Sequence, residues 1–460
     1  IDADPRWLEL ASAWIERRGK PGPHTSDTPR SYFMDHLPIR DVPEVTGHAV
    51  RTLFYLVGVA DVAQETGDES LKDAARRLWQ NVTTRKMCIT GSVGTQASDE
   101  GFGPAYDLPN DGYCESCAAC GLIYFADSMF RMDGNARAVD VLERTLYNAV
   151  LHGISLEGTT TYYRNPLQDS NHPRDNCWVC CPPCLSRTLL RVPDYVYAQT
   201  DRDIYVNLYV GSEATITLAD GNVTLRQTTD YPWDGQVRFD LSLERPRRFA
   251  LRLRMPAWAP GFSVTVQGQT TAEHVIAAGY AVLDREWHDG DTVHVSMPMP
   301  VTRVEAHPDV DADRGRIALQ RGPIIYALEG LDNGGDIDVE LPATPAFVVE
   351  ARADLLGRIA VVHGHRVDGR PWTAIPFYSL ANRGNTSQTV WIRQQAKTET
   401  REGWDDRLYK PYHPAADEGN SAATAAEPTA TFIMPWLAAG PYRQEGKECQ
   451  QLFDVVFPPE

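Results

Sequence analysis

The sequence predicts a multidomain protein of α plus β class, in which a helical part is followed by antiparallel β-sandwich domains. A chain of 460 residues is too long for one hydrophobic core, so several domains are expected. Apolar residues recur at helical spacing over roughly the first 195 residues. From about Ile204 onward they alternate with a period of two, as in half-buried strands.

The helical part contains one well-marked pair of helices. The stretch Val50–Val82 has helical apolar spacing that is interrupted at Thr66–Asp68. Gly67 suits the left-handed position after a helix, and Asp68 can cap the helix that follows. Two helices are therefore predicted in this stretch.

The same plan returns further along the chain. Gly67 and Asn81 are fourteen residues apart, and so are Gly134 and Asn148. The segment Trp7–Gly19 is similar to the second helix of such a pair. Repeated antiparallel helix pairs are typical of a helical toroid or solenoid, and this part would supply about half of a closed toroid.

Two β-regions follow the helices. In the first, turn residues separate the alternating runs, which predicts an antiparallel sandwich. Its expected strands are Asn222–Gln227, Gln236–Leu243, Phe249–Met255, Ser263–Gln267, Tyr280–Asp284 and Thr292–Met297. The second region begins near residue 301 and has the runs Arg316–Gln320, Ile324–Leu328, Phe347–Glu350 and Thr429–Met434. A low-complexity stretch at 411–428 is expected to be an exposed loop.

Composition narrows the classes of partner. A net charge of −18 argues against nucleic acid or an anionic membrane as the main partner, because either requires a basic face. No apolar run reaches the ~20 residues of a transmembrane helix, and no secretory signal is visible. The chain starts at Ile1 without a Met, so we expect the natural N-terminus to be missing. Nine clustered cysteines favour metal binding and a reducing compartment, which predicts a cytoplasmic location.

Seven of the nine cysteines lie in two clusters, Cys114–Cys120 and Cys177–Cys184. Thiolates gathered with a carboxylate, here Glu115, are a ligand set that zinc selects. Glu115 and Cys117 open a helix that is predicted to run to Met132, and a helix N-terminus favours the thiolate form of cysteine. This cluster is therefore a candidate metal site.

Cys180 and Cys181 can approach one ion from a turn, because adjacent cysteines rarely pair with each other. Simpler explanations compete with this one. Cysteine is small enough to fill a buried helix face, and we prefer that explanation for Cys120, Cys88 and Cys449. Two Cys-x-x-Cys knuckles, Cys114 with Cys117 and Cys177 with Cys180, could also hold a structural zinc ion. Such a four-cysteine site would not use Glu115 as a ligand.

Three further polar residues have ordinary explanations when taken alone. Glu100 lies on a Gly-flanked loop, where a carboxylate is usually solvated, and it gains interest only as the partner of a nucleophile. His48 precedes a long apolar helix, where histidine is more often a structural cap. Tyr163 lies in a segment that is typical of a strand and a turn.

Taken together, the short motifs of this chain resemble glycoside hydrolase family 127, the β-L-arabinofuranosidase group. The similarity runs from the first residues to about residue 210 and continues more weakly through the β-regions. The matching motifs are Asp35–Arg40, Val45–Arg51, Lys86–Gly94, Tyr106–Asp111, Glu115–Cys117, Asn165–Leu167 and Cys180–Pro183.

The resemblance implies an (α/α)6-barrel catalytic domain followed by β-sandwich domains. On this basis residues 1–197 are the C-terminal half of the barrel, 198–300 a β-sandwich, and 301–460 a second β-sandwich. The first half of the barrel is absent from this chain, so a missing or separate segment would complete it. Position 184 is Cys where the family usually has Asn, and the loop between Tyr163 and Cys180 is short.

The resemblance also implies the site residues and a Zn²⁺ cofactor. The implied zinc ligands are Glu115, Cys117, Cys180 and Cys181. Cys180 is at the same time the implied nucleophile, and Glu100 is the implied acid/base. The implied substrate contacts are His48 and Tyr163.

The reaction that follows is retaining glycoside hydrolysis with a cysteine in place of the second carboxylate. Zinc would hold Cys180 as a thiolate that forms a cysteine-linked glycosyl intermediate, and Glu100 would act as acid and then as base. The expected sugar is a furanose, foremost β-L-arabinofuranose. Two alternatives stay open: a non-catalytic carbohydrate-binding scaffold with a structural zinc, and a carboxylate-based glycosidase or lyase that uses Asp99, Glu100 or Asp107.

The expected partners are an oligosaccharide or glycoside substrate, a second copy of the chain in a homodimer, and an N-terminal segment that completes the barrel. Neither nucleic acid nor a membrane is expected.

Overall fold

The computed structural model describes residues 4–22, 27–173, 180–270, 275–395 and 403–412. The chain folds into two compact units. The first comprises Ile1–Met132, Arg144–Ser186 and Val301–His413, and the second comprises Asp133–Glu143, Arg187–Pro300 and Pro414–Glu460. The run Thr429–Met434 lies outside the described residues, and so does the predicted loop at 411–428 apart from its first two residues.

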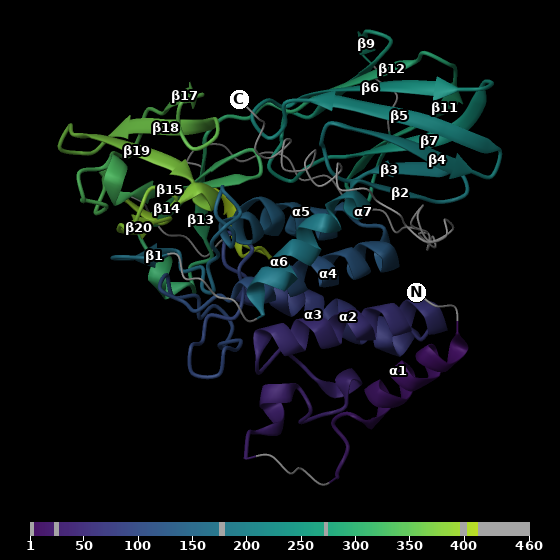
Figure 1. The fold of residues 1–460 in the computed structure, drawn as a ribbon, viewed down its shortest axis with the longest axis horizontal. Helices are drawn as coiled ribbons and strands as arrows, with labels where there is room; N and C mark the ends of the chain where they lie inside the picture. The colour runs from purple at the N-terminus through teal and green to yellow at the C-terminus, as the bar shows by residue number, and fades with distance from the viewer. Residues whose placement is uncertain (1–3, 23–26, 174–179, 271–274, 396–402, 413–460) are drawn as a thin grey trace. The chain divides into compact units, whose positions relative to one another are not determined.

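Seven α-helices lie within the described residues (Figure 1). They are α1 (Pro5–Arg17), α2 (Ala49–Thr66), α3 (Glu69–Asn81), α4 (Ser116–Asp133), α5 (Ala136–Thr145), α6 (Cys181–Leu190) and α7 (Val192–Val196). π-helical turns extend α3 and α5 at Val82–Lys86 and Leu146–Val150.

The predicted helix pair is confirmed. α2 ends at Gly67, whose φ of 67° is left-handed, and α2 packs against α3 (Figure 1). Asp68 caps α3, because its side chain accepts a hydrogen bond from the Leu71 amide at 3.1 Å. The same helix–turn–helix plan recurs in α4 and α5, with Gly134 between them at a φ of 64°.

The repeated asparagines each fasten a helix end to a distant segment of the first unit. The Oδ1 atom of Asn81 accepts a hydrogen bond from the Val45 amide at 3.0 Å. Asn148 accepts from the Ile325 amide at 2.8 Å and donates to the Pro323 carbonyl at 3.0 Å. The repeat in the sequence therefore marks a structural role, because each asparagine anchors a helix end to another segment, a loop at Val45 and the start of β15 (Ile324–Glu329) at Ile325.

Helix α4 is buried on nearly all sides, with sixteen of its eighteen residues inaccessible. A helix that is apolar all round lies inside a fold rather than on its surface. Its first turn, which holds Ser116 and Cys117, is accordingly fixed by packing.

Two sheets make up most of the second unit (Figure 1). One has the order β10-β11-β7-β3-β2 and the other the order β4-β5-β6-β12-β8-β9. Their strands are β2 (Tyr197–Gln199), β3 (Asp203–Val206), β4 (Ser212–Leu218), β5 (Gly221–Thr229), β6 (Gln236–Leu243), β7 (Arg247–Arg254), β8 (Ser263–Val266), β9 (Gln269–Thr270), β10 (Val275–Ala277), β11 (Tyr280–Trp287) and β12 (Thr292–Ser296).

All six strands predicted for this region are present. Alternate residues of β5, β6 and β12 are buried, as in a two-layer sandwich. Pairing among these described strands is antiparallel except between β3 and β7, which run parallel. The strictly antiparallel prediction is wrong at that pair, because the chain crosses over from β3 through the other sheet before it forms β7.

The first unit contains an eleven-stranded sheet whose main path is β16-β21-β14-β15-β19-β18-β17. Its strands are β1 (Gln168–Asp169), β13 (Thr302–Ala306), β14 (Arg316–Arg321), β15 (Ile324–Glu329), β16 (Glu340–Leu341), β17 (Val348–Arg352), β18 (Ile359–His365), β19 (Pro371–Pro376), β20 (Gln388–Thr389), β21 (Ile392–Gln394) and β22 (Tyr409–Pro411). Strand β1 comes from the helical part of the sequence and pairs with β20. The segment that precedes β1 is thereby anchored to this sheet.

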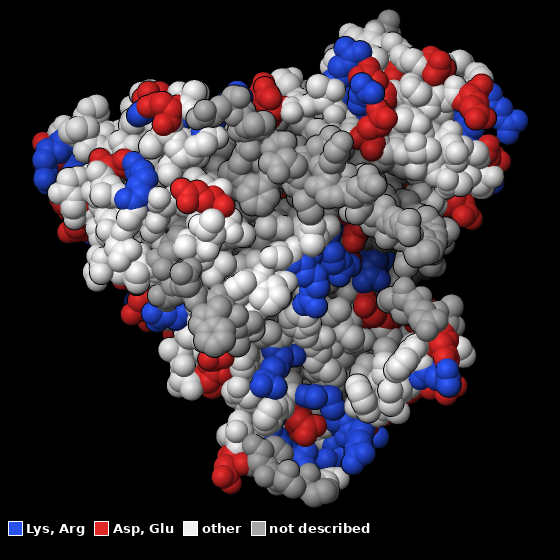
Figure 2. Space-filling model, viewed as in Figure 1, with Lys and Arg blue, Asp and Glu red and all other residues white. Residues whose placement is uncertain are grey.

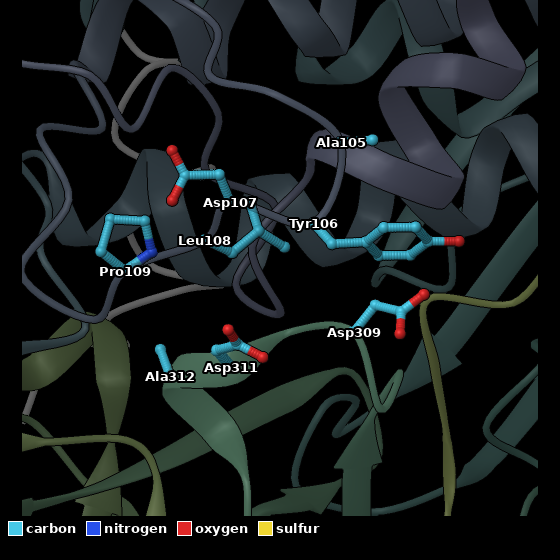
Figure 3. A pocket seen from close by; sticks show the side chains of 8 residues that line it. All are labelled: Ala105, Tyr106, Asp107, Leu108, Pro109, Asp309, Asp311 and Ala312. Atoms are coloured by element: carbon cyan, nitrogen blue, oxygen red, sulfur yellow. The ribbon is translucent and has the colours of Figure 1, made fainter. Parts of the chain in front are cut away.

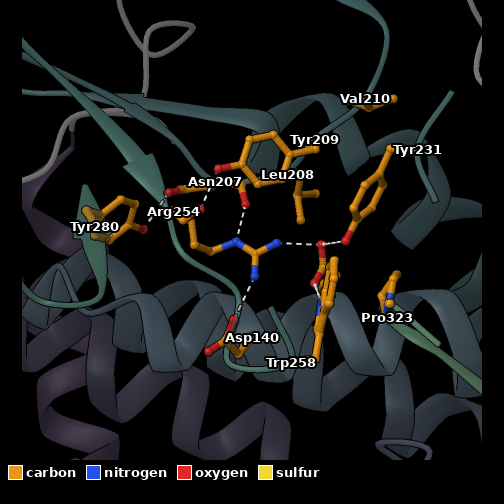
Figure 4. A network of polar contacts seen from close by, with 12 residues as sticks. Asp140, Asn207, Leu208, Tyr209, Val210, Tyr231, Arg254, Trp258, Tyr280 and Pro323 are labelled. Atoms are coloured by element: carbon orange, nitrogen blue, oxygen red, sulfur yellow. Dashed lines mark hydrogen bonds and ion pairs between the residues drawn. The ribbon is translucent and has the colours of Figure 1, made fainter. Parts of the chain in front are cut away.

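A buried ion cluster lies inside the second unit (Figure 4). The side chain of Arg254 has no exposed surface, and its Nη1 atom lies 2.6 Å from Oδ1 of Asp140. Its Nη2 atom donates to Glu143, which also accepts a hydrogen bond from the Tyr231 hydroxyl at 2.6 Å. The Nε atom donates to the Asn207 carbonyl at 2.6 Å. The cluster ties helix residues of α5 to the sheets of the same unit.

The face shown in Figure 2 carries charges of both signs among the described residues, with Lys and Arg the more frequent in the lower central part of the view. In the part of the chain that the structure describes, no helix combines the length and apolarity needed to cross a bilayer.

Candidate active site

The site begins where a loop meets the start of α2. The Glu100 carbonyl accepts a hydrogen bond from the Ala49 amide at 3.0 Å, and Gln96 and Gly101 exchange two backbone hydrogen bonds at 3.1 Å. Glu100 itself has a φ of 54°, a left-handed conformation that costs a non-glycine residue ~1–3 kcal/mol. The surrounding hydrogen bonds hold Glu100 in this tight reversal of the chain.

The carboxylate of Glu100 is engaged at both oxygens. The Nε2 atom of His48 lies 2.9 Å from Oε2, and the Tyr113 hydroxyl donates to Oε1 at 2.9 Å. His48 occupies the N-cap position of α2, yet its side chain makes no capping hydrogen bond. The ordinary explanation of His48 as a helix cap is therefore wrong.

Four potential ligands converge beside this pair. Glu115 and Cys117 come from the start of α4, and Cys180 and Cys181 come from the start of α6. Their donor atoms all lie within 4.8 Å of one another. The Cys180 sulfur lies 3.4 Å from Oε1 of Glu115, and the sulfurs of Cys117 and Cys181 are also 3.4 Å apart. A carboxylate oxygen of Glu115 also lies within 4.8 Å of donor atoms of His48 and Glu100.

Without a cation, the surroundings of this cluster disfavour the ionised forms of its carboxyl and thiol groups. Burial raises the pKa of Glu115, and burial together with the neighbouring Cys181 and Glu115 raises the pKa of Cys180 to about 12. Contacts with the thiols of Cys181 and Cys184 and burial raise the pKa of Cys117 far above its usual range. Without a cation these thiols stay protonated at neutral pH. A bound divalent ion would offset the cost of ionising these thiols, because coordination to a metal deprotonates a thiol.

The donor set fits a soft or borderline metal ion. Three sulfurs and one carboxylate oxygen match the tetrahedral ligand sets of zinc. The second oxygen of Glu115, Oε2, is buried and has no hydrogen-bond partner. A buried carboxylate oxygen without a partner is costly, so a positive ion at this place is chemically consistent with the residues.

A buried polar network fixes the segment that carries two of these donors. The Asn165 side chain donates to the Cys114 carbonyl at 3.0 Å and to the Ser116 hydroxyl at 2.9 Å. Its own oxygen lies 2.7 Å from Nδ1 of His152, and the Ser116 hydroxyl donates to the Tyr162 carbonyl at 2.7 Å. Ser116 stands between Glu115 and Cys117, so this network sets the position of both.

Tyr163 lies at the edge of the same group. Its ring meets the Tyr113 ring edge to face, with centroids 5.8 Å apart, and its carbonyl accepts a hydrogen bond from the Ser116 amide at 3.0 Å. Tyr163 thus stands beside the tyrosine that contacts Glu100.

The remaining described cysteines have other surroundings. Cys114 faces Cys88 across 3.8 Å and does not belong to the four-donor group, which disfavours a structural site of two Cys-x-x-Cys knuckles. Cys120 is fully buried on α4. Cys184 is buried, and its thiol contacts that of Cys117. Cys177 and Cys449 lie outside the described residues.

Asp107 does not belong to the four-donor group. It lines a pocket with Tyr106, Asp309 and Asp311 (Figure 3), and its Oδ2 atom accepts a hydrogen bond from Gln96 at 2.7 Å. This pocket groups Asp107 with Asp309 and Asp311, but it includes none of the four donors. The other two acids of the carboxylate-based alternative, Asp99 and Glu100, do not line it.

Sequence reasoning missed Tyr113, Asn165 and Cys184 as members of the site. Asn165 stood in one of the matching motifs, and Tyr113 directly precedes the first cysteine cluster. Neither position showed which side chain it would contact, because both contacts join segments that are distant in the sequence.

Comparison with known proteins gives consistent matches along the chain. Residues 2–194 match a family model described as the catalytic domain of the GH127 β-L-arabinofuranosidases. Residues 203–299 match the middle domain, and residues 301–393 match the C-terminal domain of glycoside hydrolase family 127.

Individual relatives agree with these matches. A non-reducing end β-L-arabinofuranosidase of Bifidobacterium longum is 34% identical over an alignment of 414 positions. The match covers 79% of this chain and 62% of that relative's length. The crystal structure of a GH127 β-L-arabinofuranosidase from Geobacillus stearothermophilus T6 matches with 36% identity and a TM-score of 0.81, over 86% of this chain and 70% of that one. A second GH127 β-arabinofuranosidase structure matches with 34% identity and a TM-score of 0.80, over 86% and 66%.

Proposed function

The chain belongs to glycoside hydrolase family 127, and from this membership we propose that it is a zinc-thiolate retaining glycosidase that releases β-L-arabinofuranose from the non-reducing end of a glycoside. The single observation that carries this proposal is the convergence of Glu115, Cys117, Cys180 and Cys181 beside the His48–Glu100 pair. These are the ligand residues that the family resemblance implies, and the names of the relatives specify β-L-arabinofuranose as the sugar. Both support hydrolysis of a β-L-arabinofuranoside.

Zinc is the proposed cofactor, and Glu115, Cys117, Cys180 and Cys181 would hold it. When bound, the ion would supply the positive charge that keeps Cys180 a thiolate at neutral pH. Cys180 suits the role of nucleophile, because it is the solvent-exposed member of this buried group. An exposed sulfur can meet a sugar, whereas Cys117 and Cys181 are enclosed.

The first half of the proposed reaction transfers the sugar to the protein. The Cys180 sulfur forms a bond to the anomeric carbon while the bond from that carbon to the leaving oxygen breaks. Glu100 gives its proton to the leaving oxygen, which adds on the order of 10²–10⁴-fold to the rate. His48 and Tyr113 keep the Glu100 carboxylate in place during this step.

The second half releases the sugar. Glu100 accepts a proton from water, the water oxygen bonds to the anomeric carbon, and the bond to the Cys180 sulfur breaks. The two displacements restore the original configuration, which defines a retaining glycosidase. His48 and Tyr163 are the proposed sugar contacts, as they border Glu100 and Tyr113.

Reduced thiols at the site suit a reducing compartment, and we propose a cytoplasmic location on that ground.

A panel of aryl glycosides that includes the β-L-arabinofuranoside tests this function. The intact protein should release aryl alcohol from that substrate, and Cys180→Ser should abolish release while the protein stays folded by circular dichroism. Cys88→Ser is the matched control, because Cys88 is buried but lies outside the donor group. Turnover that survives Cys180→Ser would contradict the proposal.

A further inference from the structure

The cluster contains one thiol that the proposed reaction does not use. Cys184 lies on the first turn of α6, and its amide donates to the Cys180 carbonyl at 3.3 Å. Residues three and four apart share one face of a helix, so Cys184 stands on the same face as Cys181 and Cys180. Its side chain is only 7% exposed, so it is turned into the protein.

This thiol reaches the donor group itself. Cys184 contacts the thiol of Cys117, and the Cys117 sulfur lies 3.4 Å from that of Cys181. Cys184 is not among the four donors that lie within 4.8 Å of one another. Binding of the ion by Cys184 would therefore require its side chain to move, and a change between staggered χ1 positions is the smallest such movement.

The proposed function creates a need for such a thiol. When the Cys180 sulfur bonds to the anomeric carbon, it changes from an anionic thiolate to a neutral thioether, which is a weaker ligand for zinc. Glu115, Cys117 and Cys181 would then be the strong ligands that remain for the ion. Zinc that takes no water as a reactant is usually enclosed by four protein ligands, as in structural sites, and Cys184 would complete such a set.

We propose that Cys184 is a reserve zinc ligand, which binds the ion when Cys180 leaves it. Its thiol proton passes to water, which reaches the site past the exposed Cys180, and the exchange reverses when the sugar is hydrolysed off. This inference rests on the proposed function for its role in turnover. The ligand exchange itself can be measured without substrate.

Cys180→Ala mimics the loss of that ligand in the resting protein. This variant should still bind one zinc ion per chain, with an affinity within about tenfold of the unmodified protein. X-ray absorption at the zinc edge should count three sulfurs at the ~2.3 Å of a zinc–sulfur bond, from Cys117, Cys181 and Cys184. A count of two sulfurs in this single variant would overturn the proposal.

The double variant Cys180→Ala/Cys184→Ser gives the second test. Competition with a chromophoric zinc chelator should show a further fall in zinc affinity on the order of 100-fold. Cys180→Ala/Cys88→Ser is the matched control and should bind zinc like Cys180→Ala alone. Equal affinities in the Cys184 double variant and in Cys180→Ala would show that Cys184 only packs against Cys117.

The two failures are distinguishable. If Cys180→Ala turns over the arabinofuranoside, the proposed function is wrong whatever the zinc measurements give. If Cys180→Ala is inactive and its zinc has two sulfur ligands, the proposed glycosidase function is retained and the proposal that Cys184 is a reserve ligand is wrong.

Discussion

The Nε2 atom of His48 lies 2.9 Å from the Oε2 atom of Glu100, although the two residues are fifty-two positions apart in the sequence. The contact forms because the loop that carries Glu100 reverses its direction and hydrogen-bonds to the first residue of α2. The histidine at the helix start therefore orients the proposed acid/base.

Replacing His48 by Ala should lower kcat/KM on an aryl arabinofuranoside by about 100-fold. Displacement of a catalytic group by about 1 Å typically reduces the rate by this factor. The fold should persist, since the His48 side chain caps no helix. His288→Ala is the control, because that histidine lies 3.7 Å from Glu286 in an exposed pair. A change of less than threefold in His48→Ala would mean that the ring does not orient Glu100.

Asn165 should matter for both folding and metal binding. Asn165→Ala removes three side-chain hydrogen bonds from a fully buried network. The Cys114 carbonyl, the Ser116 hydroxyl and Nδ1 of His152 each lose one partner. The free energy of unfolding should fall by ~2–4 kcal/mol, and zinc affinity should fall by ~10–100-fold. Denaturant titration and chelator competition measure the two effects.

Asn171→Ala provides the comparison, because Asn171 lies six residues further along the chain and is exposed. Its effect on the free energy of unfolding should stay within ~0.5 kcal/mol. Loss of stability in Asn165→Ala with unchanged zinc affinity would show that the network supports the fold without positioning Glu115 and Cys117.

The metal-free protein should lose stability as the pH rises. The folded protein raises the pKa of Cys180 to about 12, above the ~8.5 of an unperturbed thiol, so the unfolded chain gives up this proton at lower pH. The contribution of the protonated Cys180 thiol to the free energy of unfolding is complete below pH ~8.5 and declines from there toward pH 12. Thermal unfolding between pH 7 and 10 after chelation should show this decline, and Cys180→Ser should show less of it.

The Arg254 cluster should respond differently to loss of one charge and to loss of all its charges. Removing only Arg254 should destabilise the fold more than replacing Arg254, Glu143 and Asp140 together. Arg254→Met alone leaves the buried Glu143 and the partly exposed Asp140 without their counter-charge. It should cost ~3–5 kcal/mol in the free energy of unfolding, mainly through Glu143. Adding Glu143→Gln and Asp140→Asn should recover much of that loss, because no uncompensated charge remains. Denaturant unfolding of the three proteins checks this, and equal stability of the single and triple variants would contradict it.

The sequence was most informative where local rules decide the structure. Gly67, which lacks a side chain, readily adopts the left-handed conformation that ends α2, and the Asp68 side chain caps α3. The structure separates the two helices at these residues. The alternating runs Gln236–Leu243 and Thr292–Met297 likewise became β6 and β12 within one residue, because burial of one face dictates a period of two.

Contacts between distant segments could not be read in the same way. Arg254 ends a strand and looks like a solvated charge, yet it is fully buried because Asp140 and Glu143 of another element meet it. The parallel pairing of β3 and β7 leaves no mark on the periodicity of either strand. At the site, the donor group was expected from motifs, whereas Tyr113 was missed because its hydroxyl meets Glu100 only after the loop has folded.

The central claim is that Cys180 carries the sugar during turnover. The most direct measurement is mass spectrometry of Glu100→Gln after incubation with an activated aryl β-L-arabinofuranoside. This variant should still transfer sugar from a good leaving group but should lack the base that activates water, so the intermediate should accumulate. The account predicts one pentosyl group on the peptide that contains Cys180; a pentosyl group on Glu115, or turnover with no adduct on Cys180, would contradict it.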